Sequence, residues 1–217
     1  MATHDTIVVG ASAGGVQALT KLVTGLPADL PAAVFIVLHI PAESPGLLPT
    51  ILARDSGLPV AHAVDGNEIR PGQVYVAPPD QHLIIEQKRV RLVHGPKENR
   101  HRPSIDALFR SAAHWAGPRT IGVVLTGARD DGTVGMRAIN QRGGITIVQD
   151  PHEALFPSMP MSVIKEIRVD YTVPLSEIAP LLAHLSRTTA EQGGRYPVPK
   201  NVEIETRIAQ QRWRVTS

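Results

Sequence analysis

The sequence contains no cysteine, no long apolar run and no strong excess of either charge. The missing cysteine excludes disulfides, cysteine-ligated zinc and a thiol nucleophile. No stretch approaches the ~20 apolar residues of a membrane-spanning helix, and the N-terminus lacks the basic and apolar segments of a signal peptide. We therefore expect a cytoplasmic protein that does not insert into a membrane.

The charge balance is nearly even. The 217 residues include 22 Lys and Arg against 20 Asp and Glu, which gives a formal net charge of +2. So small an excess does not indicate nucleic-acid binding, and we expect no nucleic-acid partner. No Gly-Lys-Ser/Thr triplet occurs, so a P-loop is excluded. We expect no cofactor and no bound metal.

Segments typical of strands and of helices alternate along most of the chain. The predicted strands are residues 6–9, 33–38, 73–77, 120–125, 146–148 and 170–173, and the predicted helices are residues 15–24, 46–55, 104–116, 133–142, 161–167 and 175–186. This alternation predicts an α/β fold with a doubly wound, mainly parallel sheet and helices on both faces. Residues 83–86 and 90–93 flank Gln87-Lys88-Arg89 and instead predict one antiparallel hairpin.

The composition changes near residue 188, so we expect one domain over residues 1–187 and a linker and tail over residues 188–217. Residues 191–199 contain two glycines and two prolines and are typical of a linker. Residues 201–213 predict a short helix with imperfect apolar spacing. We interpret it as packed on the domain or frayed, with a docking segment for a partner as the alternative.

The turn after the first predicted strand reads Gly10-Ala11-Ser12-Ala13-Gly14 and fits the Gly-x-Ser-x-Gly pattern of a nucleophile elbow. Glycines on both sides allow a sharp turn that exposes the Ser12 hydroxyl, and the next helix directs free N–H groups at developing negative charge. The same residues half-match a dinucleotide fingerprint, but Ser12 replaces its second glycine. A third interpretation is a plain turn with a helix-capping serine.

Polar residues follow three predicted parallel strands at the edge where such sheets form their sites. Ser12 follows the first strand, His39 follows the second, and Asp130 and Asp131 follow residues 120–125. Serine, histidine and a carboxylate are the residue set of an acyl-transfer triad. The residues alone leave Asp130 and Asp131 as alternative carboxylates.

The other histidines have no obvious partner in the sequence. We expect His62, His94 and His114 to lie on the surface or to be satisfied in the core. His82 follows Pro-Asp-Gln in a predicted loop, where lining a cleft is an alternative to a purely structural role. We assign none of these four histidines a catalytic role.

Several blocks of the sequence resemble the catalytic domain of the chemotaxis protein-glutamate methylesterases, the CheB family. They read Ile-Val-Val-Gly-Ala-Ser-Ala-Gly-Gly at 7–15, His-Ile-Pro at 39–41, Val-Tyr-Val-Ala-Pro-Pro-Asp-Gln-His-Leu at 74–83, Asn-Arg-His-Arg-Pro-Ser-Ile-Asp-Ala-Leu-Phe at 99–109, Leu-Thr-Gly-Ala-Arg-Asp-Asp-Gly-Thr-Val-Gly-Met at 125–136 and Ala-Leu-Phe-Pro-Ser-Met-Pro at 154–160. The resemblance extends over residues 6–185, and these ordered blocks together are far more specific than any single motif.

The resemblance implies a catalytic triad of Ser12, His39 and Asp131, and so selects Asp131 over Asp130. It also implies a fold distinct from the α/β-hydrolases, whose triad order is serine, acid, histidine. The implied activity removes methyl esters from glutamates on the cytoplasmic helices of chemoreceptors and releases methanol. Some members of the family also deamidate glutamine there.

The chain also departs from the family pattern. It begins shortly before the first predicted strand, so we expect no receiver domain. Ala13 replaces a small polar residue, and Gly127-Ala128-Arg129 replaces Gly-Met-Gly, which indicates a different substrate preference. We expect the oxyanion donors to be the Ala13 N–H and one N–H from residues 127–129.

Two further alternatives remain at this stage. The Arg100–Arg102 block either contacts acidic side chains of a receptor helix or forms a cap and ion-pair cluster before the helix at Ser104. The fold also accommodates a triad acting on another protein or on a small ester, or a non-catalytic anion- or nucleotide-binding module.

Overall fold

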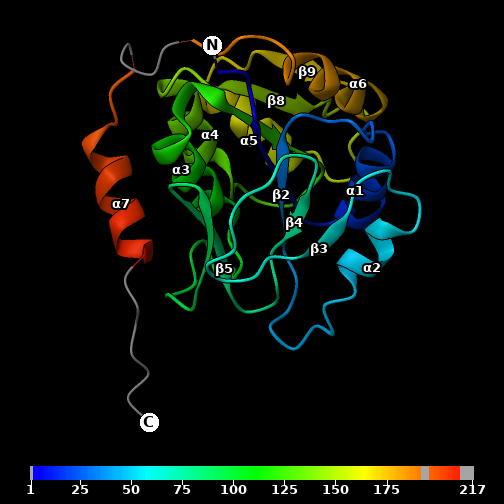
Figure 1. The fold of residues 1–217 in the computed structure, drawn as a ribbon, viewed down its shortest axis with the longest axis horizontal. Helices are drawn as coiled ribbons and strands as arrows, with labels where there is room; N and C mark the ends of the chain where they lie inside the picture. Colours follow the sequence, from blue (N-terminus) through cyan, green and yellow to red (C-terminus); the bar gives the residue numbers. More distant parts are fainter. Residues whose placement is uncertain (1, 192–195, 211–217) are drawn as a thin grey trace.

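The computed structural model describes residues 2–191 and 196–210. A seven-stranded parallel sheet carries helices on both faces, and a separate two-stranded antiparallel sheet lies beside it (Figure 1). In sheet order the seven strands are β3 (Val60–His62), β4 (Val74–Val76), β2 (Ala33–Leu38), β1 (Thr6–Ala11), β7 (Thr120–Val124), β8 (Ile145–Gln149) and β9 (Tyr171–Val173). The predicted fold class is confirmed, and the antiparallel pair is the predicted hairpin, β5 (His82–Glu86) and β6 (Arg89–Val93).

Two hydrophobic cores lie on opposite faces of the sheet because successive strand residues point to opposite sides. One core packs Ile7 and Val9 of β1 against α1 (Gly15–Thr24), α2 (Leu48–Ala53) and α6 (Leu175–Leu185). The other core packs Val8 of the same strand against the hairpin and the remaining helices of the main domain. Those helices are α3 (Ile105–Trp115), α4 (Thr133–Gln141) and α5 (Ser158–Glu166). Every residue of β1 is buried, which agrees with the apolar run from Ile7 to Ala11 that follows Thr6.

The chain reverses its direction across the sheet at β1. From β1 it moves through β2 to the β3 edge, and it then returns through the hairpin and α3 to β7 on the other side. A crevice forms at such a switch point, outside the carboxyl ends of the strands. The residues that follow β1, β2 and β7 therefore meet there.

Some predicted boundaries were wrong for identifiable reasons. β3 was not predicted because it is a three-residue edge strand that is only half-buried. α5 begins at Ser158 rather than at residue 161, because Pro160 lies in the first helical turn, where its missing N–H costs no hydrogen bond. α2 is shorter than the predicted residues 46–55.

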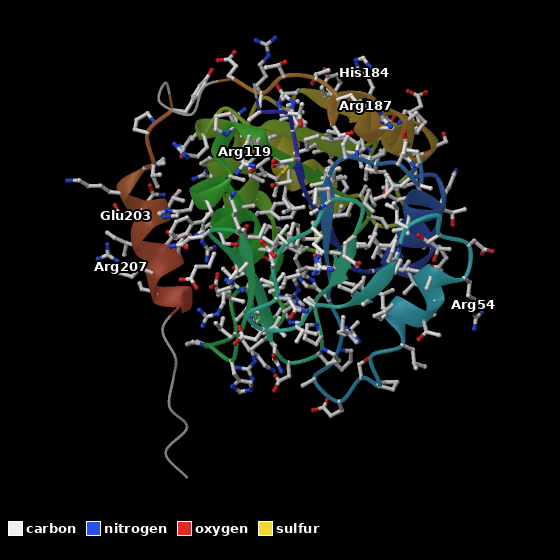
Figure 2. The ribbon with its side chains drawn as sticks, in the orientation of Figure 1. Arg54, Arg119, His184, Arg187, Glu203 and Arg207 are labelled. Carbon is white, nitrogen blue, oxygen red and sulfur yellow. The ribbon has the colours of Figure 1, made fainter. Side chains whose placement is uncertain are left out.

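The tail returns to the domain as α7 (Lys200–Gln210), which lies alongside α3 (Figure 1). Val202 is 1% exposed and Thr206 is 3% exposed, so one face of α7 is buried. Glu203 and Arg207 form an ion pair one turn apart on its outer side, at 2.9 Å (Figure 2). This packing agrees with the interpretation that the tail packs on the domain. The parts of the predicted linker and helix at 192–195 and 211–213 lie outside the described residues, and the division at residue 187 stays a prediction.

No helix in the described part of the chain combines the length and the apolar character needed to cross a membrane.

Gly10 of β1 makes the close approach of α3 possible. A Cβ atom at Gly10 would lie 2.4 Å from Cγ2 of Ile105, the first residue of α3. We predict that Gly10→Ala lowers the free energy of unfolding by about 1–3 kcal/mol through overpacking. The loss should be smaller when Ile105→Ala is also present, because the clashing atoms are then gone. Urea unfolding of both single variants and of the double variant measures this coupling, and purely additive losses would contradict it.

Candidate active site

The ends of three strands bring Ser12, His39 and Asp131 into one connected group. Ser12 follows β1, and His39 follows β2 with its N–H donating to Ala11 O at 3.1 Å. His39 Nδ1 lies 3.1 Å from Ser12 Oγ, and His39 Nε2 lies 2.7 Å from Asp131 Oδ2. The imidazole therefore contacts the hydroxyl through one nitrogen and the carboxylate through the other.

The turn at Ser12 has the shape of an elbow. Ser12 N donates to Thr126 O at 3.1 Å, which ties the end of β1 to the end of β7. Gly14 has φ +73° and is the residue that precedes α1. The interpretation of Ser12 as the helix cap is therefore wrong, because Gly14 occupies that position and the Ser12 hydroxyl faces His39.

Asp131 is the most completely bonded group of the site. Its carboxylate accepts hydrogen bonds from Asn99 Nδ2 (2.8 Å), Ser104 Oγ (3.0 Å) and the N–H groups of Ile105 (2.8 Å), Asp106 (3.1 Å) and Gly132 (3.1 Å). Two of these N–H groups belong to the first turn of α3, so the positive end of that helix faces the carboxylate. Burial raises the pKa of Asp131, but the hydrogen bonds from His39, Asn99 and Ile105 outweigh it and hold that pKa well below its usual range.

The two candidate carboxylates lie in different environments. The Asp131 side chain is 1% exposed and bonded to His39, whereas Asp130 is exposed to solvent. The geometry therefore joins His39 to the aspartate that the family resemblance selected.

A second carboxyl group lies directly behind Asp131. Asp106 is 2% exposed, and Asn99 Nδ2 reaches both its Oδ2 and Asp131 Oδ1 at 2.8 Å. Burial and the charge of Asp131 raise the pKa of Asp106 to about 7, although the Gly135 N–H bonds to it at 2.7 Å. No sequence pattern predicted a role for Asn99, Ser104 or Asp106, although all three lie in the 99–109 block.

A cleft of about 460 Å³ opens in front of Ser12 and His39, and Lys97, Arg100 and His101 also line it. Lys97 and Arg100 are exposed to solvent. Arg102 instead binds Asp80 Oδ1 at 2.7 Å and Gly95 O at 2.6 Å. The two arginines of the Arg100–Arg102 block therefore have different surroundings. Arg102 belongs to an ion-pair cluster, whereas Arg100 is exposed on the cleft.

The four histidines without a catalytic assignment have other surroundings. His82 is buried and bonded to Pro96 O, His62 to Gly46 O and His94 to Asp80, and His114 packs edge-on against Trp115. Within the described residues, no group of three or more His, Asp or Glu side chains is arranged to hold a metal ion.

The N–H groups near Ser12 differ in their partners. Gly127 N donates to Phe156 O at 2.9 Å, and Arg129 N donates to Ser158 Oγ at 3.1 Å. Within the part of the chain that the structure describes, the N–H groups of Ala13 and Ala128 have no hydrogen-bond acceptor. These two N–H groups are therefore available as hydrogen-bond donors, and the expected oxyanion donors stay a prediction.

The family profile described as CheB methylesterase matches residues 7–182, most of the chain. The chain belongs to the CheB methylesterase family. Its fold is similar to that of a solved CheB methylesterase catalytic domain from Thermotoga maritima, with a TM-score of 0.80 and 36% identity. That match covers 83% of this chain and 98% of the Thermotoga chain.

Two curated relatives extend this comparison for the CheB-family chain. It is 40% identical over 190 residues to a putative protein-glutamate methylesterase/protein-glutamine glutaminase of Leptospira interrogans, covering 87% of this chain and 98% of the relative. It is also 40% identical over 188 residues to protein-glutamate methylesterase/protein-glutamine glutaminase 1 of Xanthomonas euvesicatoria. That match covers 85% of this chain but only 52% of the relative.

The raised pKa of Asp106 predicts a pH-dependent stability for this CheB-family chain. An unfolded aspartate has a pKa of about 3.9, so between about pH 4 and pH 7 the folded state holds a proton that the unfolded state has released. The contribution of Asp106 to the free energy of unfolding must then fall as the pH rises through this range. We expect the stability of the wild type relative to Asp106→Asn to fall by ~2 kcal/mol between pH 5 and pH 8. Denaturant unfolding tests this, with exposed Asp130→Asn as the control, and a constant difference would contradict it.

Proposed function

We propose that this chain is a protein-glutamate methylesterase and protein-glutamine glutaminase that acts as a serine hydrolase. In this proposal Ser12 is the nucleophile, His39 the general base and acid, and Asp131 the group that orients the imidazole. The observation that carries it is the unbroken chain of contacts from Ser12 Oγ through both His39 nitrogens to Asp131. No cofactor enters the proposed reaction.

The surroundings of Asp131 determine which nitrogen of His39 carries the hydrogen. Because Asp131 is ionised, the ring donates its Nε2–H to that carboxylate at 2.7 Å. The lone pair of Nδ1 then accepts the Ser12 hydroxyl hydrogen at 3.1 Å. Ser12 is thus next to a base that is already oriented.

In the first half-reaction, Ser12 Oγ attacks the ester carbonyl carbon while its proton moves to His39 Nδ1. The resulting tetrahedral oxyanion expels methoxide, which takes that proton and leaves as methanol. In the second half-reaction water gives a proton to His39 and attacks the glutamyl-serine ester. Serine leaves, takes the proton back and frees the glutamate carboxylate. With a glutamine substrate, ammonia leaves in place of methanol.

The tetrahedral oxyanion needs hydrogen-bond donors that are already in place. We assign this role to the N–H groups of Ala13 and Ala128, which flank Ser12 from the ends of β1 and β7. The neighbouring N–H groups of Gly127 and Arg129 already bond to Phe156 O and Ser158 Oγ. Within the expected range of residues 127–129, the proposed oxyanion donor is therefore the N–H group of Ala128.

The proposed substrate is the methylated cytoplasmic helix region of a chemoreceptor, with the enzyme acting in the cytoplasm. Lys97 and Arg100 support this substrate because both are exposed on the cleft beside Ser12. Two cations at this rim favour a polypeptide with carboxylates close to the esterified glutamate. Arg129, which replaces a glycine of the family pattern, adds a third exposed cation near this rim.

We predict that Ser12→Ala abolishes methanol release from a methylated chemoreceptor cytoplasmic fragment. Removing the nucleophile of a serine hydrolase lowers kcat by several orders of magnitude. Methanol release is measured with the wild type, with Ser12→Ala and with Ser176→Ala, a control at an exposed serine on α6. Only the first and third proteins should release methanol.

Two other outcomes would redirect the assignment. If no protein releases methanol but a small activated ester still acylates Ser12 in the wild type, the triad stands and the substrate is another protein or a small ester. If Ser12 cannot be acylated at all, the anion-binding alternative takes precedence. That alternative predicts that phosphate or a nucleotide raises the Tm without any ester cleavage.

A further inference from the structure

The flat face of the His39 imidazole is covered by a second histidine that the proposed reaction does not use. The ring of His101 stacks on that of His39 with centroids 3.6 Å apart and planes 4° apart. The two edge nitrogens of His39 are engaged by Ser12 and Asp131. His101 is therefore the contact that faces the ring plane itself.

The backbone around His101 holds it firmly in this place. Glu98 and His101 exchange two backbone hydrogen bonds, Glu98 N to His101 O at 3.1 Å and His101 N to Glu98 O at 2.8 Å. Between them, Asn99 has φ +49° and Arg100 has φ +70°, a left-handed pair typical of a tight two-residue hairpin turn. The Glu98 side chain is in turn bonded to Arg110 of α3.

This four-residue turn contacts two members of the proposed triad at once. Asn99 Nδ2 donates to Asp131, and the neighbouring His101 ring covers His39. A parallel ring at van der Waals distance opposes any tilt of the His39 plane. Such a tilt would move Nδ1 away from Ser12 and Nε2 away from Asp131 together.

We propose that His101 is a positioning residue whose stacked ring holds the His39 imidazole in the plane that joins Ser12 to Asp131. This inference deepens the proposed function and rests on it. A pre-set ring plane raises kcat because proton transfer requires the aligned geometry, and small misplacements of reacting groups cost large factors in rate. His101 acts through His39 and transfers no proton itself.

The charges around His101 favour its neutral form. Burial lowers the pKa of His101, the neighbouring His39, Arg129 and Lys97 lower it further, and only Asp131 opposes them. At neutral pH the stacked ring is therefore uncharged. A neutral His101 ring does not repel the positive charge that His39 gains during the proposed reaction, whereas a protonated His101 would repel it.

The test compares four variants by the rate of fluorophosphonate labelling at Ser12 and by methanol release. His101→Phe keeps a flat, uncharged ring and should retain the wild-type rates within about 3-fold. His101→Ala and His101→Leu remove the flat face and should lower kcat about 10- to 100-fold with little change in KM. The control is His184→Ala, an exposed histidine on α6 (Figure 2), which should match the wild type.

The dependence of kcat/KM on pH provides a second test, because a purely structural role of His101 would leave its shape unchanged. His101→Lys places a fixed cation against His39, so protonation of His39 becomes harder. The acid limb of kcat/KM should shift to lower pH in this variant, while kcat at its plateau falls. The profile of His101→Phe should follow that of the wild type.

Several results would overturn the stacking role. Wild-type rates in His101→Ala would do so, as would equal losses in His101→Phe and His101→Leu. If the wild type is labelled at Ser12 but releases no methanol, the proposed substrate fails and the labelling rates still test the stack. If the wild type is not labelled, the hydrolase proposal fails. Ring ¹⁵N NMR of His39 in the wild type, His101→Phe and His101→Leu then tests the stacking role. This role requires that the wild type and His101→Phe keep the single Nε2–H tautomer of His39 and that His101→Leu loses it.

Discussion

The carboxylate of Asp131 at the amino end of α3 is the interaction on which the site depends. Five hydrogen-bond donors other than His39 converge on it, from the 98–101 turn, the start of α3 and the start of α4. This convergence requires α3 to lie close to β1, and the missing side chain at Gly10 permits that approach. The close packing of the sheet and the position of the proposed general base are thus parts of one arrangement.

A buried charge needs such an arrangement because desolvation of an unpaired carboxylate is very costly. At Asp131 the hydrogen bonds outweigh burial and the charged form is kept. At Asp106, the second residue of α3, burial and the charge of Asp131 prevail and raise the pKa to about 7. The two adjacent carboxyls are therefore pushed in opposite directions, and Asn99 bridges them. Asp131 therefore stays charged beside His39 through neutral pH, whereas Asp106 exchanges its proton in that range.

Much of the arrangement could be predicted from the sequence because it follows local patterns. Apolar runs and helical periodicity gave the sheet, and the rule for the carboxyl ends of strands placed Ser12 and His39 at one edge. This rule could not choose between Asp130 and Asp131, because both follow the same strand. They differ only in which side chain points into the protein, and the sequence does not show that. The family resemblance selected Asp131, and the geometry joins that residue to His39.

The remaining parts of the site depend on contacts between distant segments. Asn99, His101 and Ser104 come from a connection between β6 and α3 with no regular periodicity. Their positions depend on left-handed residues at 99 and 100 and on the Glu98–Arg110 ion pair, none of which has a local sequence signal. β3 was not predicted for a related reason, because a strand of three residues, of which Ala61 is exposed, carries too little apolar pattern.

The strand β1 also divides the proposed chemistry into two sides. On the β2 side, His39 contacts Ser12 and the 98–101 turn, and it bonds to Asp131, which comes from the connection after β7. These contacts govern the proposed proton transfer. On the β7 side, a Cβ atom at Gly127 would lie 2.5 Å from Met159 and 3.0 Å from Ser12 Cβ, which leaves no room for a side chain. The bonds of Gly127 and Arg129 to Phe156 and Ser158 attach this turn to the start of α5. The 127–129 turn and Asp131 lie on the same connection from β7 to α4, so substitutions at the start of α5 act first on the turn assigned to oxyanion binding and reach His39 only through Asp131.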